Sequence, residues 1–467
     1  MILTGGTETA LTMLDDNPRL NLFAETGGKD ATIVTAVSDR DLAIKHILHS
    51  AFSHSGQKCS ATSLLLLQSE VYDDPAFRRS LCEAVQSLKV GSAWELDTKM
   101  GPMIKPPSGD LETALKVLEP GEEWAVMPQP VEGNPCLWTP GVKYGVRPGS
   151  YTHMTEFFGP LLAVMRFERL NEAVALVNQT GYGLTSGLES LDEREWDYWK
   201  SHIRAGNLYI NRVTTGAVVL RQPFGGMGKS GFGPGMKAGG PNYVAQFMDF
   251  EDVAGAPVDG IPLTHTLAAL CTGLQARPQD GDARIIAAVL SYERNQREEF
   301  GAEHDHFRLV GQDNVRRYLP VGSVRVRVHA NDTAFDVFAR ACAAHVAGCG
   351  VVISTPPGLD SAAVQRLEEL TQSWAAAIEF VEETDAQLVQ ALRERQVDRV
   401  RYAAPDRASL EVLQAGNAAN GCVVSVPVSA EGRLELLWYV REQSISTDYH
   451  RYGNLGIRAD EERAAVM

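Results

Sequence analysis

Up to Asp252, short apolar runs alternate with amphipathic stretches, a pattern typical of strands that alternate with helices. The apolar runs predict strands at residues 20–24, 32–35, 63–68, 161–167, 186–189 and 206–211. The amphipathic stretches predict helices at residues 39–53, 74–88, 170–179 and 193–203. Strands and helices in alternation predict the α/β fold class for this part of the chain.

A second α/β unit is predicted after a Gly- and Pro-rich segment at residues 254–262, which has the composition of a linker. Strands are predicted at residues 323–329, 350–354, 378–381, 399–403 and 422–426, and helices at 332–346, 362–373, 385–394 and 407–414. Strands joined by single helices predict a parallel, Rossmann-like sheet. We therefore predict a first unit at 1–253, a linker at 254–262, a second unit at 263–440 and a tail at 441–467.

The overall charge excludes one class of partner. Lys and Arg number 43 against 59 Asp and Glu, which gives a net charge of −16. A surface this acidic repels phosphate backbones, so we expect no nucleic-acid partner. The short basic runs Arg316-Arg317 and Arg325-Val326-Arg327 are predicted to be exposed positions on or near a strand.

The apolar runs and the cysteines indicate the cellular compartment and whether a metal site is expected. No apolar run approaches the roughly 20 residues that a membrane-spanning helix needs, and the first residues carry no signal-peptide pattern, so we expect no membrane span. The seven cysteines are scattered without Cys-x-x-Cys spacing. This set predicts free thiols in a reducing compartment and no structural zinc or other metal site, so we expect a cytoplasmic protein.

The strongest candidate chemistry lies in two short segments. Glu25 precedes Gly27-Gly28-Lys29, and Cys59 stands in the run Gly56-Gln57-Lys58-Cys59-Ser60. A thiol in a Gly-rich turn leaves room for a substrate carbonyl, and a carboxylate can serve as base for the thiol or for water. Taken alone, each residue has a simpler interpretation, because most single cysteines are buried packing residues and most Glu residues before Gly-Gly are solvated. Lys29 could contact a phosphate or cap a turn, and we favour the turn.

Further motifs occur in the same order as in a known family. They are Leu3-Thr4-Gly5-Gly6-Thr7-Glu8, Glu156-Phe157-Phe158-Gly159-Pro160, Gly206-Asn207-Leu208-Tyr209-Ile210-Asn211 and Pro223-Phe224-Gly225-Gly226. Together with the segments of Glu25 and Cys59, they resemble the aldehyde dehydrogenase superfamily. The stretches 206–217, 221–228 and 237–241 are similar to the L-glutamate γ-semialdehyde (pyrroline-5-carboxylate) dehydrogenases, above all to that module of the bifunctional proline-utilisation (PutA) proteins.

The resemblance implies a fold for each unit. Residues 1–253 would be the C-terminal half of the dehydrogenase module, that is, its catalytic domain with part of the cofactor domain. Residues 263–440 would be the Rossmann-like C-terminal domain of long PutA proteins, which the segments 316–320 and 443–455 also resemble. Ser354 stands where the dehydrogenase template has its NAD-ribose lysine, so this domain is predicted to be non-catalytic, as a lid, spacer or assembly surface.

The resemblance also implies an activity, the oxidation of L-glutamate γ-semialdehyde to L-glutamate with NAD, which is the second step of proline catabolism. Cys59 would attack the aldehyde carbon to give a thiohemiacetal, and its own backbone N–H would donate to the oxyanion. After oxidation to a thioester, Glu25 would act as general base for the water that hydrolyses it.

Contacts to NAD and to substrate are implied in the same way. The NAD contacts would be Thr4, Gly5, Gly6 and Thr7 at the pyrophosphate, Glu156 at the nicotinamide ribose and Phe158 near the nicotinamide. The α-carboxylate of the substrate would be bound by Ser60 and the backbone amides of Gly216 and Ala217, and Phe224 would wall the aldehyde end of the pocket. Gly6 and Ala10 replace the Ser and Gly of most relatives, and both departures fit the PutA-like group.

Two alternatives stay open beside this interpretation. The N-terminal half of the family module has no counterpart in the sequence, so the chain is predicted to be a truncated gene model or one piece of a split enzyme. Activity in isolation is therefore doubtful, and the chain is expected to be part of an oligomer or a module of a larger bifunctional protein. The alternatives are a non-catalytic remnant that binds partners through its C-terminal domain, and a dehydrogenase for another semialdehyde, such as succinic semialdehyde.

Overall fold

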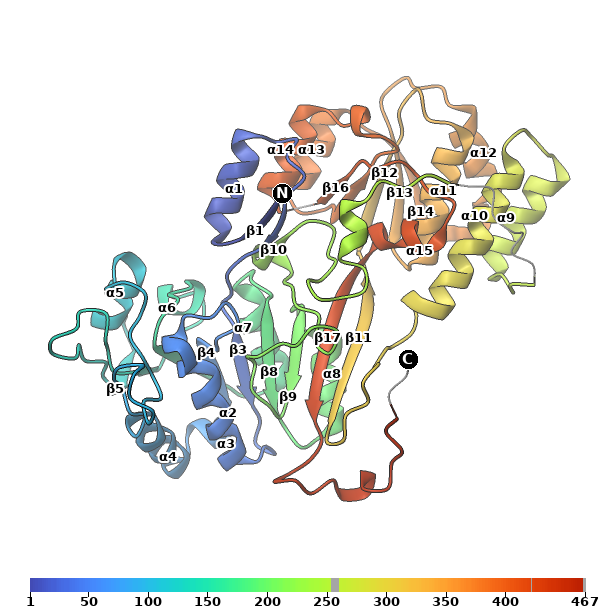
Figure 1. Ribbon diagram of the computed structural model, residues 1–467. Coiled ribbons are helices and arrows are strands. Elements are labelled where there is room, and N and C mark those ends of the chain that lie inside the picture. The colour runs from blue at the N-terminus through green and yellow to red at the C-terminus, as the bar shows by residue number, and fades with distance from the viewer. Residues whose placement is uncertain (253–259, 421, 465–467) are drawn as a thin grey trace.

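The computed structural model describes residues 1–252, 260–420 and 422–464. The predicted linker at 254–262 lies mostly outside the described residues. Figure 1 shows one large sheet in the lower part of the view and a smaller parallel sheet above it, each flanked by helices. This is the predicted α/β class.

The large sheet has nine strands in the order β11-β17-β9-β8-β3-β4-β7-β6-β5. Their bounds are β3 (Ala31–Val34), β4 (Leu64–Gln68), β5 (Glu123–Val126), β6 (Gly141–Tyr144), β7 (Leu161–Phe167), β8 (Thr185–Glu189), β9 (Asn207–Ile210), β11 (Gln312–Pro320) and β17 (Val440–Asp448). Strands β3, β4, β7, β8 and β9 run parallel to one another. All five were predicted from their apolar runs, with ends that differ by one residue at most.

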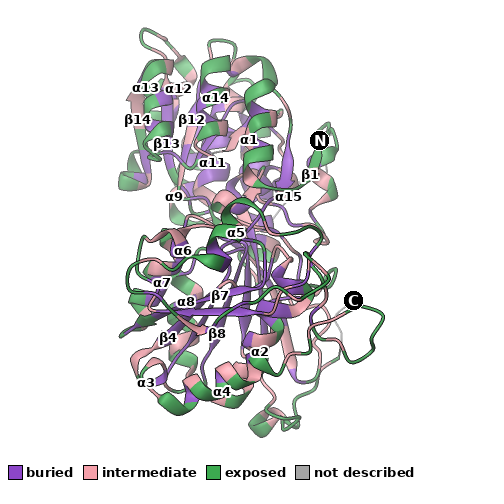
Figure 2. Ribbon diagram, turned by 90° about the vertical axis from the view of Figure 1, so that its left-hand side faces the viewer, coloured by how far each residue is buried: buried purple, intermediate pink, exposed green. Residues whose placement is uncertain are grey.

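Helices cover both faces of this sheet because its side chains alternate. Ile33, Leu64 and Leu66 pack against helices α7 (Leu170–Gln179) and α8 (Glu193–His202) on one face. Val34, Leu65 and Leu67 pack on the other face against α2 (Arg40–Phe52) and α4 (Pro75–Gln86). Successive side chains of a strand point to opposite faces, so a strand with four consecutive leucines, such as Leu64–Gln68, must be covered by helices on both faces. Figure 2 shows these strands buried between the two layers.

A three-stranded sheet lies beside the large one, in the order β1-β2-β10. It consists of β1 (Ile2–Thr4), β2 (Phe23–Glu25) and β10 (Gly231–Phe232), and helix α1 (Thr7–Asp16) packs on it through Ala10 and Leu14. The strand predicted at 20–24 is therefore shorter and later than expected, and Glu25 is its last residue.

The C-terminal unit contains a five-stranded parallel sheet in the order β14-β13-β12-β15-β16. Its elements are β12 (Ser323–Arg327), α11 (Ala334–Val346), β13 (Gly350–Thr355), α12 (Ala362–Leu370), β14 (Ile378–Glu382), α13 (Asp385–Arg393), β15 (Arg399–Arg401), α14 (Leu410–Ala418) and β16 (Cys422–Val424). The first strand along the chain lies at the centre, which is the doubly wound order of Rossmann folds. The helix predicted at 407–414 begins only at Leu410, because the Ser409 hydroxyl caps the amide of Val412.

Several elements were not predicted from the sequence. They are α3 (Ser69–Tyr72), α5 (Gly109–Lys116), α6 (Tyr151–Met154), α9 (His265–Ala276), α10 (Asp282–Asn295), α15 (Gly432–Glu435), β5, β6, β10, β11 and β17. The most consequential are β11 and β17, which form an antiparallel ribbon whose strand β17 lies parallel to β9. Both strands come from residues beyond 263, yet they extend the nine-stranded sheet of the first unit. The predicted domain limits at 263 and 440 stay predictions.

The prediction that the basic runs are exposed is wrong for two residues. Arg316 and Arg327 lie on strands, as expected, but each is buried. Arg316 pairs with Glu299 at 3.0 Å, and Arg327 pairs with Asp385 at 2.7 Å. Each burial is possible because a carboxylate from another segment neutralises the guanidinium.

The two units make direct contacts. Helix α1 packs against α14, and the side-chain amide of Asn417 donates to the carbonyl of Pro18 at 3.2 Å. Arg399 donates to the carbonyl of Pro234 at 2.7 Å. In the part of the chain that the structure describes, no helix combines the length and the apolar character needed to cross a bilayer.

Candidate active site

Glu25 ends strand β2 at the point where the chain enters the Gly27–Gly28 turn. Its carboxylate atom Oε2 accepts a hydrogen bond from the amide of Gly226 at 3.1 Å. Thr4 on β1 is its register partner, and the amide of Gly5 donates to the carbonyl of Glu25 at 3.2 Å. The pairing of β1 with β2 thus brings the predicted phosphate-binding turn beside the predicted base.

Cys59 lies in a tight turn that follows helix α2. Gly56 in this turn has a φ of +67°, and a Cβ there would lie 2.2 Å from the carbonyl oxygen of Gly159. Only glycine allows both the left-handed conformation and this close approach. The turn holds the Cys59 side chain half-buried, with Ser60 buried after it.

Carboxylates surround the thiol. Burial raises the pKa of Cys59 to about 11, and the negative charges of Asp30, Glu25 and Glu156 add to the rise. The thiol is therefore protonated at neutral pH, and a base must take its proton before it can act as a nucleophile. Burial also raises the pKa of Glu25 to about 7, which suits a base that works near neutral pH.

Glu156 approaches the same turn from the segment before β7. Its carboxylate accepts a hydrogen bond from the amide of Gly28 at 3.1 Å, and burial raises its pKa. A Cβ on Gly27 would lie 1.9 Å from Glu156 Oε2, so only a glycine at this position allows the carboxylate to lie against the turn. Phe158 is exposed, and its carbonyl accepts from the side chain of Gln57 at 3.2 Å.

The predicted cofactor turn is open at the start of α1. Gly6 is the N-cap residue and offers no side chain to the helix, and Thr4, Gly5 and Gly6 are exposed. The Thr7 hydroxyl donates to the carbonyl of Lys229 at 2.9 Å, which fixes the first turn of the helix. The first amides of α1 are therefore free to meet an anion.

The residues predicted to bind substrate lie along two connected loops. The carbonyl of Ser60 accepts from the Thr214 hydroxyl at 3.1 Å, so the loop with Gly216 and Ala217 begins at the nucleophile turn. Gly216 has a φ of +88°, and both residues are exposed. Phe224 is half-buried and exchanges two backbone hydrogen bonds with Ala238, at 2.9 and 3.0 Å. All predicted site residues thus lie on segments that meet around Glu25 and Cys59.

The burial of two charged residues of this site was not predicted from the sequence. Lys29 is buried, lies 4.6 Å from the ring centre of Phe157, and has its pKa lowered by burial to about 7. Asp30 is buried, and it accepts from the amide of Thr185 at 2.7 Å. The only signal for either residue in the sequence was a charged pair between Gly-Gly and a predicted strand. Within the described ranges, no three His, Cys, Asp or Glu side chains gather in a way that would hold a metal ion.

Comparison with curated proteins finds relatives for the first half of the chain. The 1-pyrroline-5-carboxylate dehydrogenase of Geobacillus thermodenitrificans is 36% identical over 236 residues, which are 50% of this chain and 45% of that protein. The protein of the same name from Bacillus subtilis is 34% identical over 238 residues, again 50% of this chain and 45% of the relative. The chain therefore spans about half the length of the curated relatives it matches.

Comparison with solved structures extends the likeness to the C-terminal unit. The structure of proline utilization A (PutA) from Corynebacterium freiburgense is 36% identical, with a TM-score of 0.79. The match covers 97% of this chain and 42% of that one. The sequence profile of the aldehyde dehydrogenase family matches residues 1–253, which is more than half of the chain. The chain belongs to the aldehyde dehydrogenase family.

Proposed function

We propose that the chain carries the catalytic part of an NAD-dependent L-glutamate γ-semialdehyde dehydrogenase, which oxidises this aldehyde to L-glutamate in proline catabolism. The substrate is the open-chain form of 1-pyrroline-5-carboxylate, the compound in the names of the curated relatives. The observation that carries the proposal is the grouping of Cys59 and Glu25, close enough for the carboxylate charge to raise the pKa of the thiol. We also propose that the chain is one module of a larger protein or assembly, because the likeness to PutA covers 42% of that protein.

In this proposal Cys59 is the nucleophile. Its thiol must first lose a proton, and Glu25, with a pKa raised to about 7, is the nearby base matched to that task at neutral pH. The sulfur then bonds to the aldehyde carbon to give a thiohemiacetal, whose oxyanion would be held by the backbone N–H of Cys59.

The described residues fit NAD. The uncapped start of α1 at Gly6 offers free amides for a pyrophosphate, and the glycine at position 27 leaves a path to the Glu156 carboxylate. Thr4, Gly5, Gly6 and Thr7 would hold the pyrophosphate side, Glu156 the nicotinamide ribose, and Phe158 the nicotinamide. NAD, when bound, supplies the hydride acceptor that turns the thiohemiacetal into a thioester.

Glu25 completes the reaction in this proposal. Its carboxylate takes a proton from a water molecule as the water oxygen attacks the thioester carbon, and the carbon–sulfur bond then breaks. L-Glutamate leaves, and the sulfur of Cys59 is free for another turnover. Glu25 must be ionised for this step, so turnover is expected to rise with pH through about 7.

Selection of the substrate would rest on the loop that begins at Thr214. The hydroxyl of Ser60 and the amides of Gly216 and Ala217 would hold the α-carboxylate. Gly216 has no Cβ and a φ of +88°, so its backbone can approach an anion closely. Phe224 would close the aldehyde end of the pocket.

The test compares L-glutamate γ-semialdehyde with acetaldehyde. It uses the chain itself and, in parallel, a fusion that adds the N-terminal half of the Geobacillus relative, of which the chain covers 45%. The kcat/KM is expected to favour the semialdehyde by at least about 100-fold, because a site built for a charged group binds poorly to a substrate that lacks it. Equal values for both substrates would refute the carboxylate site. Cys59→Ala is the control, and it should lower turnover by on the order of 10⁶.

A further inference from the structure

The peptide group between Gly225 and Gly226 lies between two ionisable side chains, the buried Lys237 and the half-buried Glu25. Its carbonyl oxygen accepts a hydrogen bond from the ammonium of Lys237 at 2.8 Å. Its N–H, on the other edge of the same peptide plane, donates to Oε2 of Glu25 at 3.1 Å. One peptide group therefore links a cation to the predicted base.

Burial lowers the pKa of Lys237 to about 7, whereas the charges of Glu25 and Glu442 and the hydrogen bonds of its Nζ favour the ammonium form. Besides the carbonyl of Gly225, its Nζ donates to the carbonyl of Gly206 at 2.5 Å and to Oδ1 of Asn207 at 2.6 Å. An ammonium has three N–H donors, and this arrangement uses all three, whereas a neutral amine has only two. The side chain is buried, so these three acceptors take the place of water.

We propose that Lys237 is a positioning residue for Glu25, which acts on the carboxylate through the peptide group that joins Gly225 to Gly226. The inference rests on the proposed function only in that it takes Glu25 to be the base. An ammonium at the carbonyl end draws electron density along the conjugated peptide and makes its N–H a stronger donor. A stronger donor holds the carboxylate in one place and stabilises its ionised form.

Glycines make this close arrangement possible. A Cβ on Gly225 would lie 2.8 Å from Oε1 of Glu25 and 3.3 Å from Cγ of Lys237. A Cβ on Gly206 would lie 1.8 Å from the carbonyl oxygen of Gly225. Any larger residue at either position would separate the lysine, the peptide group and the carboxylate.

Lys237 is itself anchored from the end of the chain. Its backbone amide donates to Oε2 of Glu442 on β17 at 2.9 Å, and Asn242 donates to the other carboxylate oxygen. Ala238, the residue after Lys237, also binds the loop with Phe224 through its two backbone hydrogen bonds to Phe224. Strand β17 thus fixes the backbone from which Lys237 reaches the peptide group.

The charges around Glu25 give the expected direction of change. The titratable groups that face it are Lys237, the thiol of Cys59 and the phenol of Tyr243, while Lys237 also faces Glu442. Burial raises the pKa of Glu25 to about 7, and the charge of Lys237 and the Gly226 hydrogen bond hold it from rising further. Loss of the ammonium removes the charge of Lys237 and weakens the Gly226 hydrogen bond, both of which lower the pKa of Glu25. The pKa of Glu25 must therefore rise.

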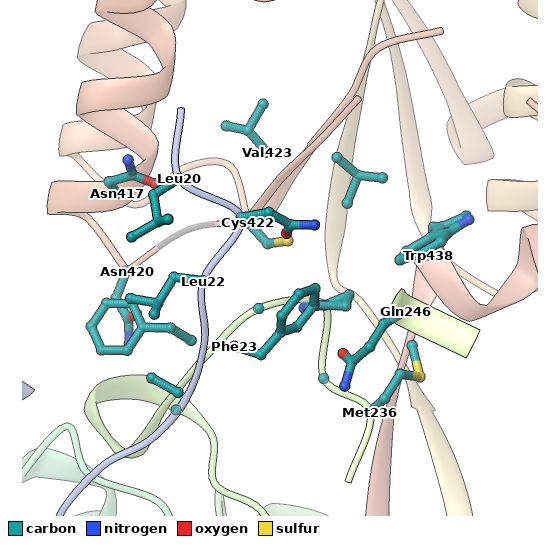
Figure 3. A pocket seen from close by; sticks show the side chains of 18 of the residues that line it. Leu20, Leu22, Phe23, Met236, Gln246, Asn417, Asn420, Cys422, Val423 and Trp438 are labelled. Atoms are coloured by element: carbon teal, nitrogen blue, oxygen red, sulfur yellow. The ribbon is translucent and has the colours of Figure 1, made fainter. Parts of the chain in front are cut away.

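The pair adjoins a cavity, so a changed side chain at position 237 need not disturb a packed core. Glu25 and Lys237 both line a cavity of about 520 Å³ between the first unit and the C-terminal unit. Figure 3 shows this cavity with Leu22 and Phe23 on one side, Cys422 and Val423 on another, and Gln246 and Trp438 near its end. A cavity of this size holds water molecules, which can exchange a proton with Glu25.

The first experiment follows the carboxyl group directly and needs no activity. Difference infrared spectra of the full chain are recorded across pH, and the Glu25 carboxyl band is assigned by its loss in Glu25→Gln. In Lys237→Gln, which keeps an N–H donor but no charge, the pKa of Glu25 is expected to rise by about 1 unit or more. Lys237→Arg keeps the charge and should give the smaller shift. An unchanged titration in Lys237→Gln would overturn the inference.

A matched control removes another buried lysine. Lys143 is buried and donates to the carbonyl of Val117 at 2.7 Å, but it pairs with Glu122 rather than with the peptide next to Glu25. Lys143→Gln should leave the Glu25 titration at its wild-type position. An equal shift in this variant would mean that any lost lysine has the effect, and this result would also overturn the inference.

The second experiment separates this inference from the proposed function. On the fusion described above, the acid limb of the kcat profile should shift to higher pH in Lys237→Gln by the same amount as the infrared titration, with little change in KM. If the wild-type protein shows no dehydrogenase activity but the infrared shift is present, the proposed function fails and the positioning inference stands. If the wild-type protein is active but Lys237→Gln changes neither the infrared titration nor the kcat profile, the positioning inference fails and the proposed function stands. If Lys237→Gln does not fold, Gly225→Ala, which displaces the Glu25 carboxylate from the same peptide, must raise the pKa instead.

Discussion

Two turns in this molecule occupy equivalent places and have opposite chemistry. Each follows a parallel strand and leads into a helix, one from β1 into α1 and the other from β12 into α11. In the first, Gly6 provides no side-chain cap, so the amides at the start of α1 are free. In the second, the equivalent residue Thr333 caps α11 with its hydroxyl, and the carboxylates of Asp332 and Asp336 accept from amides of the turn. The first turn is therefore open to an anion, and the second is closed to one.

The closed turn has two carboxylates. Asp332 accepts from the amide of His329 at 3.0 Å and pairs with Arg340 at 2.6 Å, and both side chains of that pair are fully buried. Asp336 accepts from the amide of Thr333 at 2.9 Å, while the Thr333 hydroxyl accepts from the amide of Asp336 at 3.2 Å. These two negative groups would repel a phosphate from the turn. The contrast supports the proposal that the C-terminal unit is non-catalytic, and it illustrates that a fold does not by itself carry a function.

The largest expected effect comes from breaking the closed turn. Arg340→Met leaves Asp332 buried without its cation, which is expected to lower the free energy of unfolding by about 3–5 kcal/mol. Equilibrium urea unfolding gives the overall loss, and hydrogen exchange of the α11 amides locates it. Adding Asp332→Asn to Arg340→Met should restore part of the stability, because no charge is then left unpaired. A loss below about 1 kcal/mol, the range of a surface pair, would contradict the assignment.

Sequence reasoning was most successful where burial depends on local pattern. The strands at 64–68 and 161–167 are apolar runs bounded by polar residues, and their place in a parallel sheet follows from the helices that separate them. The order of motifs pointed to Glu25, Cys59 and Glu156 before any geometry was known.

It was least successful where burial depends on a distant partner. Arg316 looked exposed because Glu299, which pairs with it, belongs to an unpredicted segment. Strands β11 and β17 are separated by more than a hundred residues, and nothing local marks them as one ribbon. Lys237 was noticed only as part of a motif, because its contact with the 225–226 peptide exists only in three dimensions.

The next effect converts the open turn into a closed one. Gly6→Asp places a carboxylate at the N-cap of α1, where a Cβ meets no atom closer than 4.0 Å. The KM for NAD is expected to rise about tenfold, or about 1.4 kcal/mol, because the new charge repels the pyrophosphate. Hydrogen exchange of the α1 amides should slow at the same time, because Asp is a better N-cap than Gly.

A neutral variant is the control for this change. Gly6→Asn provides a similar cap without the charge, so it should protect α1 to a similar degree and raise the KM for NAD less than Gly6→Asp does. Equal effects of both substitutions on the KM would mean that bulk rather than charge excludes the cofactor. That result would contradict the explanation that negative charge makes the turn before α11 closed to an anion.

The smallest effect tests whether the closed turn is held by its cap. Thr333→Ala removes the hydroxyl that accepts from the amide of Asp336, which is expected to cost about 1 kcal/mol of stability in the first turn of α11. The measurement is hydrogen exchange of the first α11 amides. Thr384→Ala is the matched control, because Thr384 and Gln387 form the same reciprocal cap on α13 without a charge. If the two losses are equal, the cap stabilises α11 through its hydrogen bonds, and the carboxylate of Asp336 serves to exclude anions rather than to hold the helix. A larger loss at Thr333 would instead mean that the charge of Asp336 stabilises the helix start, as the macrodipole favours.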